Sequence, residues 1–259
     1  MTYPDIDPVL VHLGPLQIRW YGMMYVLGFF AAYLILKRVC KREEYDMTET
    51  DIEDVLTWSI LGLIVGARVG YCIFYNFGVY LSNPLKILAV WEGGMSFHGG
   101  LIGIIIAGIC FSARRNKSFW MLADLGALSA PLGLFFGRMG NFINGELYGR
   151  VTHVSWGMVF PGAGPLPRHP SQLYEAFFEG LLMFVVIYAL GTKKHTHGHL
   201  IAAFLVFYGG IRFVLEFFRQ PDPQLGFVFA WLTMGQVLCA LMVVSGVCIF
   251  IYRLKSDKN

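Results

Sequence analysis

The residues best suited to chemistry in this chain of 259 residues lie in the segment 137–149, GRMGNFINGELYG. Arg138 is its cation, and the amides of Asn141 and Asn144 and the carboxylate of Glu146 follow. Glycines lie among them, which lets the backbone turn tightly and approach a bound group. Because the segment follows an apolar run without a gap, we interpret it as a binding surface for an anion where a membrane meets water.

A second group of polar residues lies in another apolar run, near residue 210. Its members follow i, i+4, i+8, i+11 spacing, which places them on one face of a helix: Tyr208, Arg212, Glu216 and Arg219. With Arg138, this face would supply two guanidinium groups, which grip phosphate in a bidentate fork. Arg212 and Glu216 could instead form only a structural ion pair.

His98 has glycines on both sides, in the segment 93–100, GGMSFHGG. A histidine gains and loses a proton near neutral pH and can therefore deprotonate a nucleophile such as a thiol. A lone histidine is more often structural, but the glycines leave room for a ligand, so we favour a functional role. His195, His197 and His199 lie beside lysines, and we interpret that segment as a solvated loop rather than a metal site.

The composition indicates an integral membrane protein built from helices. Hydrophobic residues make up 56% of the chain and charged residues 14%, against about 25% charged in soluble domains. The apolar runs are continuous rather than alternating, which favours helices over a barrel. The formal net charge of +3 is too small to indicate a nucleic-acid partner, and the five scattered cysteines form no metal-binding motif.

Seven apolar runs are long enough to cross a bilayer. Their approximate limits are Trp20–Leu36, Val55–Tyr75, Ser96–Ala113, Phe119–Gly137, Leu173–Gly191, Leu200–Phe218 and Phe227–Tyr252. Basic residues directly after the first run predict an N-terminus outside and a C-terminus in the cytoplasm. We therefore expect one seven-helix domain, residues 1–259, in which residues 141–170 form a small outward-facing head.

The ionisable residues of these runs lie at a similar predicted depth, in the outer half of the membrane. Insertion of a charged side chain at the bilayer centre costs about 2.5–3.5 kcal/mol, so each of these residues needs a reason. They include Tyr21, Arg68, His98, Arg138, Glu175, Glu179 and Arg212. Asp124 is the main exception, in the inner half. This pattern predicts a pocket open to one leaflet. Arg68 could instead extend its charge toward water from the close-packing stripe of Gly62, Gly66 and Gly70, and Tyr21 could be an interfacial tyrosine.

The residues alone indicate an enzyme that handles lipids or a lipid-binding membrane protein. A lipid or solute transporter of the inner membrane is the alternative, although a transporter should carry internal repeats and polar groups through both leaflets. A scaffold protein would not need His98, Arg138 and Arg212 at one depth.

Several motifs in order resemble those of the bacterial prolipoprotein diacylglyceryl transferases. They are RWYG at 19–22, HGGL at 98–101, GRMGNFINGE and Gly149 at 137–149, RHPSQLYE at 168–175, and YGGxRxxxExxR at 208–219. The resemblance spans most of the chain and is therefore specific.

The resemblance implies a reaction without an added cofactor or metal, on the outer face of the bacterial inner membrane. The diacylglyceryl group of phosphatidylglycerol passes to the lipobox cysteine thiol in the signal peptide of a prolipoprotein, a thioether forms and glycerol phosphate leaves. By the same resemblance, Arg138 and Arg212 bind the phosphate, and His98 is either the general base or a ligand of the headgroup. The remaining implied site residues shape or support the headgroup site: Tyr21, Asn141, Glu146, Gly149, Tyr208 and Glu216.

Overall fold

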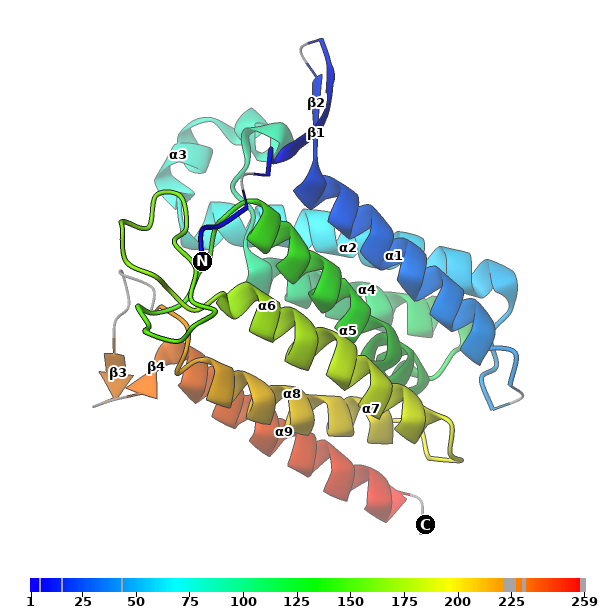
Figure 1. Cartoon of the computed structure of the whole chain (residues 1–259). Coiled ribbons are helices and arrows are strands. Elements are labelled where there is room, and N and C mark those ends of the chain that lie inside the picture. Colours follow the sequence, from blue (N-terminus) through cyan, green and yellow to red (C-terminus); the bar gives the residue numbers. More distant parts are fainter. Residues whose placement is uncertain (5, 15, 43, 221–226, 230–231, 257–259) are drawn as a thin grey trace. The chain divides into compact units, whose positions relative to one another are not determined.

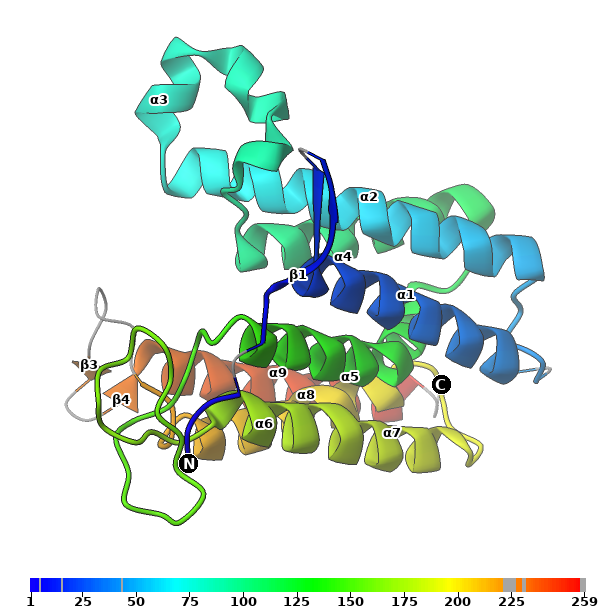
Figure 2. The same ribbon diagram turned by 45° about the horizontal axis from the view of Figure 1, so that its top comes forward.

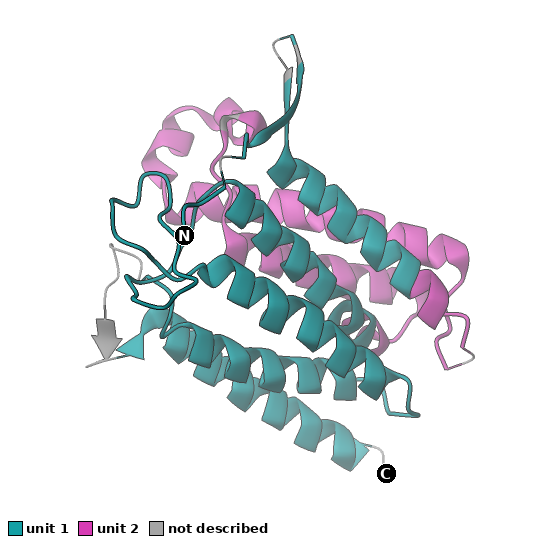
Figure 3. Cartoon of the chain, in the orientation of Figure 1, with its two compact units in different colours: residues 1–35, 124–259 teal, residues 36–123 magenta. Residues whose placement is uncertain are grey.

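The computed structural model describes residues 1–4, 6–14, 16–42, 44–220, 227–229 and 232–256 (Figure 1). In this part of the chain, the regular structure is helical apart from two short antiparallel hairpins. The chain divides into two compact units, which Figure 3 colours separately. Unit 1 comprises residues 1–35 and 124–259, and unit 2 comprises residues 36–123.

Within the described ranges, six helices are long and apolar enough to cross a membrane. They are α1 (Trp20–Val39), α2 (Glu49–Phe74), α4 (Phe97–Arg115), α5 (Phe119–Ile143), the continuous helix Ser171–Gly191 and α9 (Met234–Ser256). The seventh apolar helix, α8 (His199–Leu215), is shorter, with 17 residues. The chain is thus a multi-pass membrane protein, while the count of seven crossings and their direction stay predictions.

Unit 2 is built on the helix pair α2 and α4, joined through α3 (Phe77–Ser82), η1 (Pro84–Leu88) and η2 (Val90–Glu92). Helix α2 begins at Glu49, earlier than the predicted Val55. The cause is a capping box, in which the Asp51 amide donates to the Thr48 hydroxyl and the Thr48 amide donates back to the Asp51 carboxylate.

The glycine stripe of α2 lets this pair pack backbone to backbone, as predicted. A Cβ atom on Gly66 would collide with the backbone of Gly99 and Gly103 on α4, and one on Gly70 would lie 2.7 Å from the Cα atom of Gly99. Small residues of this kind bring membrane helices into close contact.

Unit 1 begins with the hairpin of β1 (Val9–Leu13) and β2 (Leu16–Arg19), which leads into α1. The helix Ser171–Gly191 consists of α6 (Ser171–Glu175), the π-helical segment η3 (Ala176–Leu182) and α7 (Met183–Gly191). This helix, α5, α8 and α9 run side by side in both views (Figures 1 and 2). The bundle places the ends of α5 and α8 near the start of α6.

Helix α5 runs to Ile143, so the predicted end of this run at Gly137 is wrong. The helix continues to Ile143 because its end is built as a Schellman motif. Gly145 adopts a φ of 66°, its amide donates to the Phe142 carbonyl, and the Glu146 amide donates to the Asn141 carbonyl. Arg138 and Asn141 therefore lie on the last turns of a regular helix.

The last predicted run, Phe227–Tyr252, is wrong at its start. Phe227–Phe229 form strand β3, which pairs with β4 (Leu232–Thr233), and α9 begins only at Met234. The Gln236 amide donates to the Thr233 hydroxyl and the Thr233 amide donates to the Gln236 side chain, which caps the helix at this point. Helix α8 likewise ends at Leu215 rather than Phe218.

Asp124, the predicted exception in the inner half, caps another helix from a distance. Its fully buried carboxylate accepts hydrogen bonds from the amides of Gly198 (2.7 Å) and Ile201 (2.8 Å), at the N-terminus of α8. An anion at this position offsets the unpaired amides and the helix dipole. Asp124 therefore has a structural role.

Residues 144–170, called the head from here on, connect α5 to α6 and are held by short backbone bridges rather than by a sheet. The outward-facing position predicted for residues 141–170 stays a prediction. Arg168 pairs with Val151 and Met158, and the Tyr3 hydroxyl donates to the carbonyl of Phe142 at the end of α5. Phe160 is buried here against the ring of Tyr3. These contacts fix the head over the ends of the unit 1 helices.

Candidate active site

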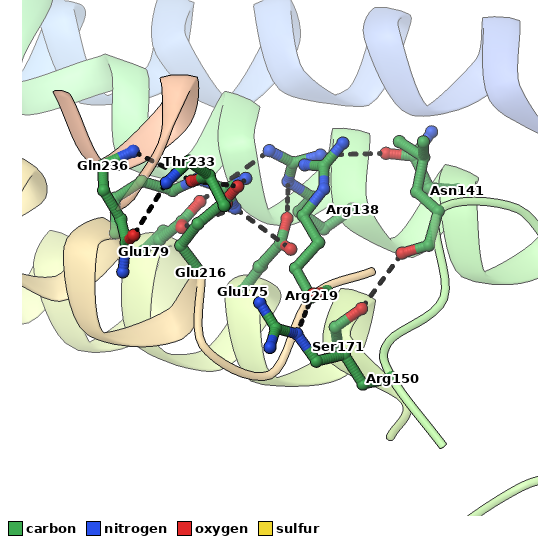
Figure 4. A network of polar contacts seen from close by, with 12 residues as sticks. Arg138, Asn141, Arg150, Ser171, Glu175, Glu179, Glu216, Arg219, Thr233 and Gln236 are labelled. Carbon is green, nitrogen blue, oxygen red and sulfur yellow. Dashed lines mark hydrogen bonds and ion pairs between the residues drawn. The ribbon is translucent and has the colours of Figure 1, made fainter. Parts of the chain in front are cut away.

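Two arginines from different helices meet at one buried carboxylate in unit 1 (Figure 4). The Nε atom of Arg138 on α5 lies 2.7 Å from Oε2 of Glu175, and the Nη1 atom of Arg212 on α8 lies 3.0 Å from Oε1. The Glu175 side chain is 2% exposed. Glu175 thus bridges the helices that carry both predicted phosphate ligands.

Two further carboxylates complete the network. Glu179, on η3, lies 3.3 Å from Nη1 of Arg212 and 3.9 Å from Nη2 of Arg138. Glu216 lies 2.9 Å from Nη2 of Arg212 and accepts a hydrogen bond of 3.1 Å from the Thr233 hydroxyl. Arg212 therefore has carboxylates on several sides, whereas Arg138 has one close carboxylate.

The π-helical segment η3 helps to bring these groups together. Glu175 ends α6 and Glu179 lies within η3, and both side chains are buried. A Cβ atom on Gly180 would lie 2.8 Å from the Cα atom of Phe135, so the helix approaches α5 closely. Single π-helical turns occur frequently at functional sites.

A chain of amides continues from Arg138 toward the head. Nη1 of Arg138 donates to Asn141 (3.4 Å), and the Asn141 amide donates to Glu146 (2.9 Å). Asn144 also donates to the Glu146 carboxylate, at 3.2 Å. Glu146 is held in turn by Gln172, which donates to its backbone carbonyl.

Gly149 lies where three backbone segments meet. Its amide donates to the His169 carbonyl, and it pairs with Arg219. A Cβ atom at this position would lie 2.5 Å from the Phe218 carbonyl and 2.7 Å from the His169 side chain. Close packing, rather than an unusual backbone conformation, thus requires glycine here.

The network retains unused donors for an anion. Of the five N–H groups of an arginine, those of Arg138 make, with described residues, one close and one distant ion pair and one long hydrogen bond, and the side chain is 18% exposed. Arg150 and Arg219 lie at the edge of the network (Figure 4), and neither forms an ion pair with a described carboxylate. The arrangement can therefore bind a phosphate from its exposed side.

A family model described as prolipoprotein diacylglyceryl transferase matches residues 8–252. The chain belongs to the prolipoprotein diacylglyceryl transferase family. A relative from Geobacter sulfurreducens is 52% identical over 95% of both chains. Relatives from Desulfotalea psychrophila and Photobacterium profundum are 47% and 46% identical over 100% and 99% of this chain and 97% of their own. Each is named a phosphatidylglycerol–prolipoprotein diacylglyceryl transferase.

Several residues of the family motifs lie close together in unit 1. Five of the predicted site residues lie in the described network: Arg138, Asn141, Glu146, Arg212 and Glu216. Tyr21 packs on α5 near Arg138, because a Cβ atom on Gly140 would lie 2.8 Å from its ring. Tyr208 lies one turn before Arg212 on α8, stacked on Phe204.

His98 belongs to unit 2, so its approach to the arginines stays a prediction of the family resemblance. It is the second residue of α4, whose N-terminus is capped by the Ser96 hydroxyl, and its side chain is exposed within the described structure. Its ring makes an edge contact with Phe97. The histidine is thus accessible rather than buried in a structural role.

Arg68, also in unit 2, does not extend toward water and is 3% exposed. Its guanidinium donates to the carbonyls of Lys86, Ile87, Gly93 and Gly94 in the connection between α2 and α4. The sequence-based alternative of an arginine that reaches the surface is therefore wrong. Arg68 holds the segment that precedes His98.

The residues predicted from the sequence to form the site did not include Glu175 and Glu179. Both were noted as costly groups in an apolar run, and Glu175 lies in the RHPSQLYE motif. The missing information was their partner, since no spacing within one helix shows that a carboxylate faces arginines on two others. An acidic residue in a membrane helix was the signal that could have placed them in the site.

Proposed function

We propose that this protein transfers the diacylglyceryl group of phosphatidylglycerol to the lipobox cysteine thiol of prolipoproteins, the first step of lipoprotein maturation. The observation that carries the proposal is the pair of arginines, Arg138 and Arg212, joined through buried Glu175 in a chain whose relatives bear this enzyme name. A guanidinium pair in an apolar bundle suits the phosphate of an anionic lipid.

In the proposed reaction, the sulfur attacks the diacylglyceryl carbon that carries the phosphate ester. The C–S bond forms, the C–O bond breaks, and glycerol phosphate leaves with the bonding electrons. Negative charge develops on the leaving phosphate, and donors that are already oriented stabilise it best. Arg138 has the free N–H groups for this role, while Arg212, with three carboxylates around it, orients the site.

The thiol must lose its proton, and His98 is the candidate base. The exposed ring at the start of α4 supports access by a substrate from outside the unit. The second role for His98 is a hydrogen bond to the headgroup, with another group accepting the thiol proton. Lipid binding distinguishes the two roles. Loss of a base should stop turnover while the lipid still binds, whereas loss of a headgroup ligand should weaken lipid binding.

The remaining site residues act on the headgroup. Asn141 and Glu146 extend the polar chain from Arg138 and supply partners for glycerol hydroxyls. Gly149 keeps the head close to the end of α8, which shapes the site. Tyr21, Tyr208 and Glu216 support the arginines from α1 and α8.

We further propose that the chain is a single domain of the bacterial inner membrane, residues 1–259, with seven crossings. Its N-terminus lies in the periplasm and its C-terminus in the cytoplasm, which the basic residues after the first apolar run support. Residues 141–170 then form a periplasmic head, and the site faces the outer leaflet. Phosphatidylglycerol and the lipobox signal peptide both reach it from the membrane.

The test is a reconstitution with purified protein, phosphatidylglycerol and a lipobox peptide, followed by mass spectrometry. We expect the peptide to gain one diacylglyceryl group and glycerol phosphate to appear in equal amount. A peptide with serine in place of the lipobox cysteine is the matched control and should stay unmodified. No adduct from well-folded protein would contradict the proposal, and translocation of a lipid without an adduct would support the transporter alternative.

A further inference from the structure

The arginine network holds more acid than base. Among the described residues, its ion pairs join two guanidinium groups, Arg138 and Arg212, to three buried carboxylates: Glu175, Glu179 and Glu216. Glu146, which Asn141 joins to Arg138, is exposed and lies outside these ion pairs. Three further titratable groups near the network are neutral in their ordinary state at neutral pH: Tyr25 on α1, Tyr208 on α8 and Cys239 on α9. With every carboxylate ionised, the network would carry one net negative charge.

Among the residues that the structure describes, no further cation removes this charge by direct contact. Arg150 donates to the Arg219 backbone carbonyl, and neither guanidinium lies within ion-pairing distance of the three carboxylates in the described structure. An anionic lipid phosphate placed beside the network would add a second negative charge. Since charges attract or repel strongly in an apolar interior, a third ionised carboxylate weakens the anion binding that the unused donors of Arg138 favour.

The three carboxylates are not equally compensated. Glu175 has close contacts with both arginines, and Glu216 has Arg212 and the Thr233 hydroxyl. Glu179 is 0% exposed, and its Oε1 atom accepts a hydrogen bond of 3.3 Å from the Nη1 atom of Arg212, which also lies 3.0 Å from Oε1 of Glu175. Among the described residues, Oε2 of Glu179 accepts no hydrogen bond and has only the 3.9 Å contact with Arg138, and Oε1 of Glu175 has only the ion-pair contact with Arg212.

A buried carboxylate oxygen without a donor is costly unless the group takes up a proton. We propose that Glu179 carries a proton whenever the site holds a phosphodiester anion, so that two guanidinium groups then face two carboxylates and the phosphate. Glu179 thereby adjusts the charge of the site to its substrate. This inference rests on the proposed function, because it takes the ligand to be an anionic phospholipid.

Infrared difference spectroscopy can test the proton directly, through the carbonyl stretching band of a protonated carboxylic acid. We expect this band in the purified wild-type protein with phosphatidylglycerol and its loss in Glu179→Gln. Glu175→Gln is the second variant, since it also leaves two guanidinium groups facing two carboxylates and should remove the band. The matched control is Asp124→Asn, another fully buried carboxylate of unit 1, which accepts hydrogen bonds from two amides and lies 3.8 Å from Nε2 of His195.

A titration of the band links the proton to the lipid. In the wild type, the band should persist to a higher pH with phosphatidylglycerol than with zwitterionic phosphatidylethanolamine, because the added negative charge favours the protonated acid. Absence of the band with bound lipid, its persistence in either Glu179→Gln or Glu175→Gln, its loss in Asp124→Asn, or equal titrations in the two lipids would each overturn the proposal. Binding of phosphatidylglycerol is measured in parallel, and failure to bind would instead count against the proposed function.

Discussion

The two units bury arginines in opposite ways. Arg68 in unit 2 donates to four backbone carbonyls and has no described carboxylate partner. Arg138 and Arg212 in unit 1 are held by carboxylates on three segments of the bundle. A ligand cannot replace backbone carbonyls as partners of an arginine without unfolding the connection. A phosphate can replace a side-chain carboxylate as a partner, because the carboxylate can move or take up a proton. A buried arginine therefore indicates a binding site only when its partners can be exchanged.

Replacement of Arg138 should have the largest effect on activity. Arg138→Ala removes the guanidinium with free donors, and we expect kcat/KM to fall by a factor of about 10² or more, as for loss of an oriented donor to a developing charge. Binding of phosphatidylglycerol should be lost with it, measured by lipid titration of the purified variant. If binding persisted unchanged, Arg138 would not be the phosphate ligand.

His98→Gln should separate chemistry from binding. The glutamine can donate and accept hydrogen bonds but cannot take up a proton at neutral pH, so we expect turnover to be abolished while phosphatidylglycerol still binds. His12→Gln, at an exposed histidine of the β1–β2 hairpin, is the control. Turnover at the wild-type rate in His98→Gln would remove this residue from the mechanism.

Arg68→Met should affect stability rather than catalysis. The methionine keeps an unbranched side chain but leaves the carbonyls of the α2–α4 connection without their donor, a loss of about 1–3 kcal/mol for an unsatisfied buried group. Thermal unfolding should occur at a lower temperature, and proteases should cut the connection faster. If Arg68→Met had a normal melting temperature but lost lipid binding, Arg68 would be a binding residue rather than a structural one.

Gly66→Ala tests the packing on which unit 2 depends. Its added methyl group meets the backbone of Gly99 and Gly103, and forced overpacking costs about 1–3 kcal/mol. The matched control is Gly78→Ala in the same unit, where a Cβ atom would have no described neighbour within 4 Å. Equal melting temperatures for the two variants would show that the helix pair is not packed as described.

The smallest effect concerns the head of unit 1. Burial lowers the pKa of His169, whose Nδ1 atom lies 3.1 Å from the Tyr174 hydroxyl. The unfolded chain therefore binds the proton more readily, so the contribution of His169 to stability is complete above about pH 6.5 and is lost as the pH falls toward the lowered value. The difference in melting temperature between the wild type and His169→Gln should become smaller as the pH falls. His153→Gln, at an exposed histidine, is the control and should keep the wild-type melting temperature at each pH.

The sequence predicted the helical membrane class, the family and most of the residues around Arg138, because apolar runs and costly charges are visible without a structure. It misplaced the start of α9 because Phe227–Phe229 are apolar in a strand as they would be in a helix. The end of α5 was misplaced because Gly137 is tolerated within the helix, and the turn that stops it lies at Gly145.

The partners of the arginines required the packing of three helices. Glu175, Glu179 and Arg212 are separated along the chain, and their contacts depend on how the helix Ser171–Gly191 rotates against α5 and α8. The π-helical turn changes that rotation and has no signature in the apolar pattern.

Because η3 departs from α-helical geometry between Glu175 and Met183, the lengths of segments matter to this protein as much as their composition. Each residue of an α-helix turns the chain by about 100°. Deletion of a single apolar residue from η3 would therefore rotate Glu175 about the helix axis relative to α7, without changing any charged side chain. Variation in this family that alters spacing by one residue can thus uncouple the arginines while every recognisable motif remains in place.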